Sequence, residues 1–217
     1  MRRIYILLKA HVLDAAIAVI LAVALFTLSK PLRDGWARKR LDANAVHAVD
    51  REWADLISVS SPLSGSPSNA DVLELSDYEC PFCRRASSSV DSAIMAGVHV
   101  GYLQYPLRIH PHAEGAAIAA LCAEASGRFK EFHARLMKTT EWQQDTNWVR
   151  EAKAAGVADL RAFGVCLKSS DIRRRLERIR TLADSVGVHG TPMFVARRGI
   201  HRGVASNADL LALARRK

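Results

Sequence analysis

The pattern of apolar and polar positions divides the chain into segments of different kinds. An almost unbroken apolar run covers residues 12–29, behind a basic stretch at 1–11. Eighteen residues are the lower limit for a helix that spans a bilayer, so we predict a transmembrane anchor at 12–29. The alternative is a cleaved signal peptide, because residues 22–24 fit a small-x-small cleavage site. We favour the anchor because the apolar run continues past that site.

The next two segments differ from each other in composition. Apolar residues, Trp36 among them, recur at roughly helical spacing through residues 30–57, which predicts an amphipathic stalk helix. This helix suits a membrane surface, with weak self-association as the alternative. Residues 58–70 are rich in Ser, Pro and Gly and predict a linker. We therefore expect the folded domain at 71–217.

The pattern inside residues 71–217 alternates between strands and helices. Residues 71–78 and 98–107 have strand character, and a helix-compatible stretch separates them. Residues 112–187 read almost wholly as helix, and two short strands then surround Gly199 before a closing helix. The sequence therefore predicts an α/β domain in the order strand, helix, strand, helical block, hairpin and helix.

Composition and charge narrow the class of protein. The chain has 217 residues, 49% of them hydrophobic, which is enough for one ordinary domain plus appendages. The formal net charge is +9, but the basic residues are spread along the chain and form no nucleic-acid-binding signature. We expect no nucleic acid as partner. An anionic membrane surface is the simpler partner for a basic chain, and the alternative is that the basic residues are merely solvated.

Two of the four cysteines, Cys80 and Cys83, lie one helical turn apart. A disulfide that closes so short a loop contributes little stability, so the pair indicates either metal ligation or thiol exchange. Zinc needs four ligands, and Cys122 and Cys166 each stand alone, 44 residues apart. A copper-delivery site would want a third soft or imidazole ligand. We therefore favour thiol exchange and expect no metal and no cofactor.

The position of Cys80 predicts its role. It lies where a strand ends and a helix begins, and Pro81 suits the first helical position. Unpaired backbone N–H groups and the positive end of the helix dipole favour the thiolate form there. We therefore expect Cys80 to attack, and Cys83 to resolve the mixed disulfide that Cys80 forms with a client protein.

Two further stretches carry candidate site residues. Glu74 lies inside the apolar strand, where a buried carboxyl would have a raised pKa and could exchange a proton with Cys83. The alternative is that Glu74 faces solvent at a strand edge. Thr191–Pro192 is a candidate cis peptide bond beside Cys80, where Thr191 would offer backbone groups to an extended client. An ordinary turn is the alternative.

These motifs resemble a known family. The stretches "VLELSDYECPFCRR", "FGVCL" and "VGVHGTPMFV" are similar in order and spacing to the thioredoxin-fold disulfide oxidoreductases of the DsbA type, in the single-domain branch with a helical insertion. The resemblance covers residues 71–217, with the insertion at about 112–187. It implies Cys80 as nucleophile, Cys83 as resolving cysteine, Glu74 as the acid beneath them, and Thr191–Pro192 as the cis-proline loop.

The resemblance also implies a function and a location. The family works outside the cytoplasm, so we expect a membrane-anchored, extracytoplasmic thiol–disulfide oxidoreductase that donates disulfides to exported proteins. By analogy a membrane oxidase recycles it, and we expect a monomer. A reductase or isomerase of the same compartment is the alternative within enzymes. A redox-inactive client-binding or chaperone module is the alternative outside them.

The remaining two cysteines are expected to pair. Cys122 and Cys166 fall on apolar faces of the helical block, and part of the resembling family carries a second, structural disulfide in this region. We therefore predict a Cys122–Cys166 bridge, because two close thiols do not stay free in an exported protein. Two separate reduced core cysteines are the alternative.

Overall fold

The computed structural model describes residues 20, 21 and 23–216. They fall into two compact units, which divide between Asn44 and Ala45 within one long helix. In the described part of the chain, no helix combines the length and the apolar character that a membrane span requires. Half of the predicted anchor, namely residues 12–19 and 22, lies outside the described residues.

The order of elements follows the predicted alternation of strands and helices. The strands are β1 (Ser61–Pro62), β2 (Val72–Ser76), β3 (Val100–Gln104), β4 (Met193–Ala196) and β5 (Gly199–Arg202). The helices are α2 (Lys30–Val59), α3 (Pro81–Met95), α4 (Ala113–Ala125), α5 (Phe129–Lys138), α6 (Trp148–Ala154), α7 (Leu160–Cys166), α8 (Ser170–Ser185) and α9 (Asn207–Ala214). Two short 3-10 helices, η1 (Pro67–Asn69) and η2 (Glu141–Gln143), complete the list.

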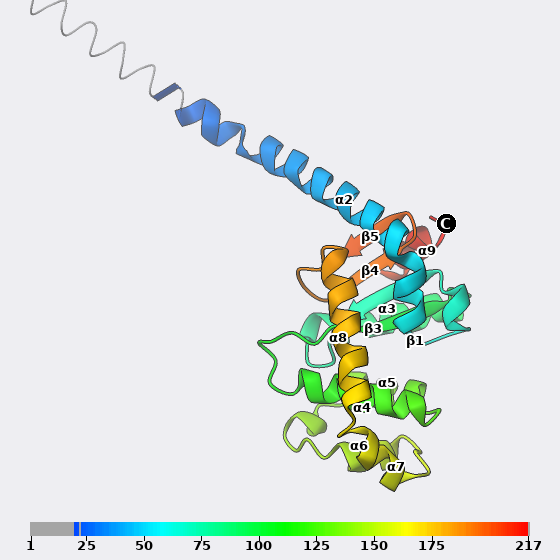
Figure 1. Cartoon of the computed structure of the whole chain (residues 1–217). Helices are drawn as coiled ribbons and strands as arrows, with labels where there is room; N and C mark the ends of the chain where they lie inside the picture. Colours follow the sequence, from blue (N-terminus) through cyan, green and yellow to red (C-terminus); the bar gives the residue numbers. More distant parts are fainter. Residues whose placement is uncertain (1–19, 22, 217) are drawn as a thin grey trace, which may run out of the picture. The chain divides into compact units, whose positions relative to one another are not determined.

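The strands form one mixed sheet in the order β1-β3-β2-β4-β5 (Figure 1). β2 and β3 are parallel, and α3 is the crossover helix that a parallel pair requires. β1 joins β3 antiparallel, while β4 pairs antiparallel with both β2 and β5. β2 therefore lies at the centre of the sheet, and the active-site segment continues from its carboxyl end.

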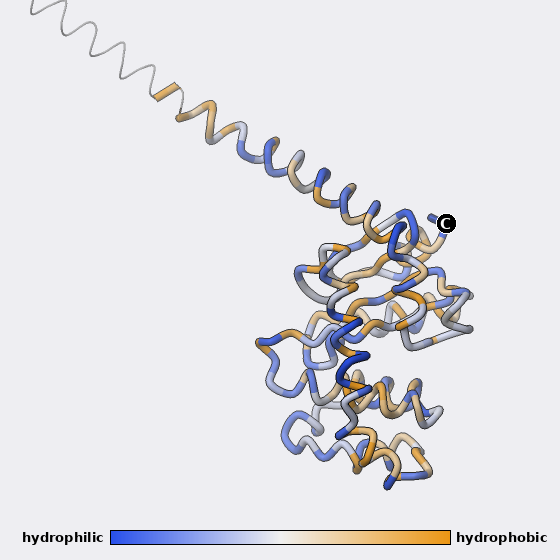
Figure 2. Tube along the Cα trace, in the orientation of Figure 1, coloured by the Kyte–Doolittle hydropathy of each residue, from blue (hydrophilic) through white to orange (hydrophobic). Residues whose placement is uncertain are grey.

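The two faces of the sheet bury different residues of the same strand. Leu73 and Leu75 pack with the C-terminal half of α2 and with α8. Val72, on the opposite face, packs with α3 and α9. This division follows from the two-residue period of a strand, which sends successive side chains to opposite faces. Figure 2 shows hydrophobic and hydrophilic residues interleaved along α2, as a helix buried on one side requires.

Helices α4 to α7 form a helical subdomain beyond one end of the sheet (Figure 1). Its core is aromatic, with Phe132, Trp142 and Phe163 all at most 1% exposed. A disulfide between Cys122 of α4 and Cys166 at the end of α7 joins two of its helices, with the Cα atoms 5.8 Å apart. This subdomain packs directly against the segment that carries Tyr78, Cys80 and Cys83.

The compact domain begins earlier in the chain than the sequence predicted. We expected a linker at 58–70 and a start near Asp71, but Ser61 and Pro62 form β1 and pair with β3. The stalk predicted at 30–57 also reaches the core, because Val49 and Leu56 of α2 are fully buried. Seven residues separate these two, so they lie on one face of the helix.

Candidate active site

Cys80 and Cys83 meet at the start of α3. Cys80 is the N-cap residue of this helix, with φ −68° and ψ 120°, and Pro81 is its first residue. Both cysteines are free thiols in the structure. Cys80 is 3% exposed, whereas Cys83 is fully buried one turn further on. An incoming sulfur can therefore reach Cys80 more readily than Cys83.

The surroundings of Cys80 favour its thiolate. Hydrogen bonding from the Cys83 thiol is the largest cause, and it lowers the pKa of Cys80 from 9.0 to about 5 against the opposing effect of burial. The Thr191 hydroxyl and the backbone N–H groups of Cys83 and Phe82 act in the same direction. Cys80 is therefore largely ionised at neutral pH, the form that attacks a disulfide.

Cys83 has the opposite character. Burial raises its pKa far above the ordinary value of 9.0, and the neighbouring Cys80 adds to the increase. The nearby Ser76 and Thr191 side chains lower the pKa of Cys83, while the charge of Glu74 raises it. Cys83 therefore keeps its proton until a base nearby removes it.

Glu74 is the nearest candidate for that base. It lies on β2, is 1% exposed, and faces away from solvent rather than sitting at a strand edge. Burial raises its pKa from 4.5 to about 7; the nearby Ser76 hydroxyl opposes this rise, and the charge of Asp91 adds to it. A carboxyl group with a pKa near 7 can both take and return a proton at neutral pH.

The Thr191–Pro192 loop lies against Cys80. The peptide bond between these two residues is cis. The Cys80 thiol donates a hydrogen bond of 3.5 Å to the Thr191 carbonyl oxygen. Because Pro192 has no N–H group, its backbone offers no donor that would compete for the sulfur. The structure thus brings together Cys80, Cys83, Glu74 and this loop, while the Cys122–Cys166 bridge lies in the helical subdomain.

Asp77 is a site residue that the sequence analysis did not single out. Its carboxylate accepts hydrogen bonds from the backbone N–H of Glu79 (2.7 Å), from that of Leu107 (2.8 Å) and from Nδ1 of His110 (2.8 Å). The side chain is fully buried. Asp77 therefore ties the segment before Cys80 to the loop after β3. The polar "SDYE" between a buried strand and the cysteines was the available signal.

Arg84 and Arg85 follow the cysteines but differ in their contacts. The Arg84 guanidinium donates to the carbonyl oxygens of Leu136 (2.6 Å) and Thr139 (2.8 Å), so it holds α3 to the end of α5. Arg85 is exposed and lies 4.6 Å from the ring centroid of Phe82. A groove of about 490 Å³ runs beside them and borders Glu79 and Pro81, the two chain neighbours of Cys80.

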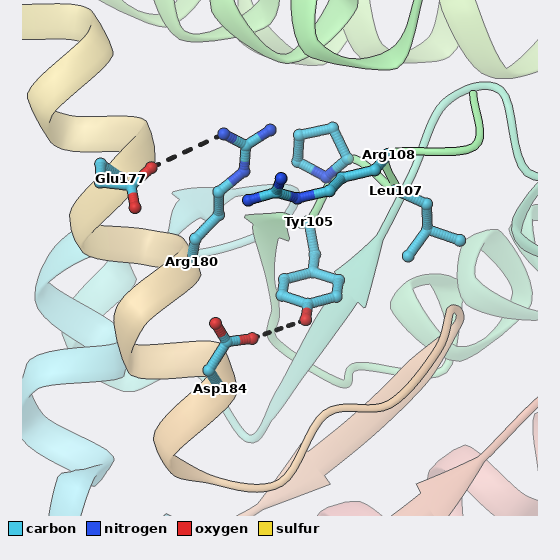
Figure 3. Close-up of a pocket in the computed structure, with 7 residues that line it drawn as sticks. Tyr105, Leu107, Arg108, Glu177, Arg180 and Asp184 are labelled. Carbon is cyan, nitrogen blue, oxygen red and sulfur yellow. Dashed lines mark hydrogen bonds and ion pairs between the residues drawn. The ribbon is translucent and has the colours of Figure 1, made fainter. Parts of the chain in front are cut away.

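A second cavity, of about 250 Å³, lies between the loop after β3 and α8. Figure 3 shows Glu177, Arg180 and Asp184 projecting from α8 toward Tyr105 and Arg108. Arg180 pairs with Glu177 at 3.6 Å, and the Tyr105 hydroxyl donates to Asp184 at 2.6 Å. No cysteine lines this cavity, so it is separate from the thiol pair.

The arrangement at Cys80 and Cys83 is suited to thiol–disulfide exchange. An ionised cysteine, a protonated and fully buried cysteine, and a buried carboxyl group with a pKa near neutrality lie within interaction range of one another. Across the described residues, no group of three or more His, Cys, Asp or Glu side chains is placed to share a metal ion.

Comparison with known sequences finds relatives that are much longer than this chain. The Na+/H+ antiporter NhaA 1 of Mycolicibacterium gilvum is 31% identical over 149 residues, which are 64% of this chain and 24% of that protein. The Na+/H+ antiporter NhaA 3 of Salinispora tropica is 31% identical over 135 residues, which are 61% of this chain and 21% of that protein. The chain thus spans about a quarter of the length of these curated relatives.

Solved structures share the fold over most of the chain. A thioredoxin-like oxidoreductase from Silicibacter pomeroyi is 27% identical, with a TM-score of 0.64 over 74% of this chain and 94% of that one. The thiol–disulfide exchange protein alpha-DsbA2 from Wolbachia pipientis is 20% identical, with a TM-score of 0.67 over 79% of this chain and 94% of that one. BcfH from Salmonella enterica Typhimurium is 17% identical, with a TM-score of 0.73 over 98% of this chain and 97% of that one. At these identities the two structures show the fold alone.

The family assignment rests on a profile that matches most of the chain. The profile of the family described as thioredoxin matches residues 58–213, which include β1 and end within α9. That span holds all five strands and the whole cysteine site. The chain belongs to the thioredoxin family, and its Cys80–Cys83 site is that of a thioredoxin-like thiol–disulfide oxidoreductase.

Proposed function

We propose that this oxidoreductase donates disulfides to exported client proteins and is itself reduced at Cys80 and Cys83. The observation that carries this direction is the pKa of Cys80, which is lowered from 9.0 to about 5. A lowered pKa means that the folded site stabilises the thiolate of the reduced form. Stabilising the reduced form makes the corresponding disulfide a stronger oxidant.

The proposed reaction balances in two exchange steps. A client thiolate attacks the Cys80 sulfur of the oxidised pair, the Cys80–Cys83 bond breaks, and its electron pair goes to Cys83. The Glu74 carboxyl group supplies the proton that this buried sulfur takes up. A second client thiolate then attacks the client sulfur of the mixed disulfide and releases Cys80 as a thiolate. The client loses two electrons, and the cysteine pair gains them.

The surroundings of Cys80 support an extended client segment. The Thr191 backbone lies against the cysteine on one side, and the groove beside Glu79 and Pro81 opens on the other. Backbone groups at such a position can pair with an extended peptide whatever its side chains. This suits an enzyme that acts on many clients.

We further propose that the catalytic domain lies on the extracytoplasmic side of a membrane, anchored by residues 12–29. The apolar run of that segment supports the anchor. The Cys122–Cys166 disulfide supports the compartment, because disulfides persist mainly in oxidising environments. A donor must also be reoxidised, and a membrane oxidase that accepts its electrons would complete the cycle.

The reduction potential of the Cys80–Cys83 pair tests the direction. The full chain is equilibrated with glutathione buffers of graded composition, and the reduced fraction is measured by thiol labelling. We expect a value between about −180 and −120 mV, the range of isomerases and strong donors. A value near −270 mV, which is typical of thioredoxin, would replace the donor with a reductase.

Membrane fractionation tests the location. The full chain should stay with the membranes after a high-salt wash, and a protease added from the outer side should reach the catalytic domain. Release by salt would contradict an anchor and indicate electrostatic attachment, because salt screens exposed charges. Protection of the domain from the outer protease would contradict the extracytoplasmic location.

A further inference from the structure

Two central strands carry a polar patch inside the protein. Glu74 of β2 lies opposite Tyr102 of β3, and Ser76 lies opposite Gln104. All four residues are at most 1% exposed. Strands buried on both faces are usually apolar throughout, so four polar side chains in register on one face are an exception. Burying them is costly unless they find partners.

Several atoms of this patch have no such partner in the described part of the chain. They are Oε1 of Glu74, the hydroxyls of Ser76 and Tyr102, and both polar atoms of the Gln104 amide. Buried polar groups normally bind each other or ordered water. Five orphaned atoms on one face therefore mark a place where water molecules bind or hydrogen bonds rearrange.

The patch is connected at one end to the active site. The Ser76 hydroxyl lowers the pKa of Glu74, of Cys83 and of Tyr102, so it lies within interaction range of all three. Ser76 thus lies close both to the Cys83–Glu74 pair and to Tyr102.

The other end of the patch reaches α5. The Tyr102 hydroxyl lies near that of Tyr78 and lowers its pKa, and their rings stack with centroids 5.3 Å apart. The Tyr78 hydroxyl and Nδ1 of His133 are 3.3 Å apart. His133 is 9% exposed, more than any other member of this series. The series Ser76–Tyr102–Tyr78–His133 therefore runs from the buried cysteine toward the surface and ends at a side chain that keeps a small exposed area.

We propose that Ser76, Tyr102, Tyr78 and His133, completed by buried water, form a proton relay between the Cys83–Glu74 pair and solvent. The inference rests on the proposed function, because disulfide donation consumes a proton at a buried sulfur. When Glu74 protonates the newly released Cys83 thiolate, a carboxylate remains in the core. The relay returns one proton from solvent to that carboxylate, which restores Glu74 for the next cycle.

The ionisation states of the relay suit this task. Burial raises the pKa of Tyr78 and of Tyr102 well above the ordinary value of 10.0. Burial also lowers the pKa of His133 to about 3, and the charge of Lys138 acts in the same direction. All three side chains are therefore neutral around neutral pH. They can pass a proton along without any of them carrying a lasting buried charge. Asp91 of α3 also faces Glu74, so it influences the pKa of the group that the relay serves.

The test compares Tyr102→Phe and Ser76→Ala with Tyr105→Phe in the full chain. Tyr105 is a matched control, because its hydroxyl donates to Asp184 instead. The oxidised protein is mixed with a dithiol peptide, and the rate of reduction of the Cys80–Cys83 pair is followed against pH in light and heavy water. We expect Tyr102→Phe and Ser76→Ala to lower this rate by roughly 10-fold and to change its solvent isotope effect. This loss of rate is smaller than the roughly 10²–10⁴-fold contribution of a group that acts directly as general acid or base.

Further readouts separate the possible results. Alkylation of Cys80 in the reduced protein should be equally fast in all variants, because the relay serves Cys83 and not the attacking thiolate. Ser76→Thr, which keeps the hydroxyl, should restore the rate. If Ser76→Ala fails to fold, Tyr78→Phe breaks the same series at another member.

The relay is overturned if Tyr102→Phe and Ser76→Ala match Tyr105→Phe in rate and isotope effect. It is also overturned if Ser76→Thr is as slow as Ser76→Ala, because the loss is then one of packing. If the unmodified protein oxidises no dithiol, the proposed function fails and the relay fails with it. If the wild type oxidises the dithiol peptide and the variants do so at the same rate, the relay fails and the proposed function stands.

Discussion

The Sγ atom of Cys80 lies 3.5 Å from the carbonyl oxygen of Thr191, although 111 positions separate the two residues in the chain. The sheet produces this approach. β4 pairs antiparallel with β2, and Met193 lies opposite Leu75, so the loop before β4 arrives where β2 ends. The helical subdomain intervenes in the sequence without disturbing this pairing. The contact at the active site is thus a consequence of strand register.

Cys80 should react far faster than Cys83 in the reduced protein. Its pKa of about 5 makes it a thiolate at neutral pH, while Cys83 is buried and keeps its proton. Titration of the thiolate absorbance should show a midpoint near pH 5, which Cys80→Ser removes and Cys83→Ala shifts upward, because no side chain at position 83 then donates to the thiolate. Alkylation of Cys83 before Cys80 would reverse the assigned roles.

Glu74→Gln should change how the stability of the reduced protein depends on pH. The folded protein holds a proton on Glu74 up to about pH 7, whereas the unfolded chain releases it near 4.5. The native state therefore binds more protons between these values, and the contribution of Glu74 to stability is lost as pH rises through that window. The loss is roughly 3 kcal/mol for a shift of this size.

Cys80 acts in the opposite sense, since its pKa is lowered on folding, so the comparison must isolate Glu74. Urea unfolding of the wild type and of Glu74→Gln across the acidic to neutral range does this, because both proteins contain Cys80. The free energy of unfolding of the wild type minus that of Glu74→Gln should fall as the pH rises from about 4.5 to about 7. Parallel curves would mean that Glu74 titrates normally.

Arg84→Met should destabilise the protein, whereas Arg85→Met should not. Arg84 donates to two backbone carbonyl oxygens at the end of α5, and losing these two charge-assisted hydrogen bonds should cost about 2 kcal/mol, although Nε1 of Trp142 still donates to both oxygens. Arg85 is exposed and only lies over Phe82. Thermal unfolding of the two variants gives the comparison. Equal effects would show that the α3–α5 contact does not depend on Arg84.

Replacing both Cys122 and Cys166 with Ser should lower stability without removing the redox pair. The bridge spans 44 residues, and the loop-entropy model assigns it about 4 kcal/mol. Mild reductants should open the Cys80–Cys83 disulfide and leave this bridge intact, because neither Cys122 nor Cys166 lies at a helix N-terminus, where a thiolate is stabilised. Thiol counting after graded reduction, with unfolding of the double variant, measures both. Simultaneous reduction of the two pairs would contradict a protected bridge.

The thiol chemistry of the site could be predicted from the sequence alone. The spacing of Cys80 and Cys83, and Pro81 at the first helical position, predict an activated thiolate from helix geometry alone. Strand and helix periodicity likewise predict the order of elements in residues 71–217, because these signals depend on neighbours within a few positions. The short strand β1 was not predicted. Its two residues, Ser and Pro, are typical of turns and are too few to show the alternation of a strand, and they pair because β3 offers a free edge.

Tertiary structure decided which distant residues share the site. Nothing near Thr191 in the sequence states that it will touch Cys80; the β2–β4 register does. The sequence also shows Tyr102 and Gln104 only as polar residues in a strand, and their position opposite Glu74 and Ser76 arises from parallel pairing across a crossover helix. Local patterns fix the conformation of a segment, whereas the partner of a segment depends on which faces the whole chain must bury.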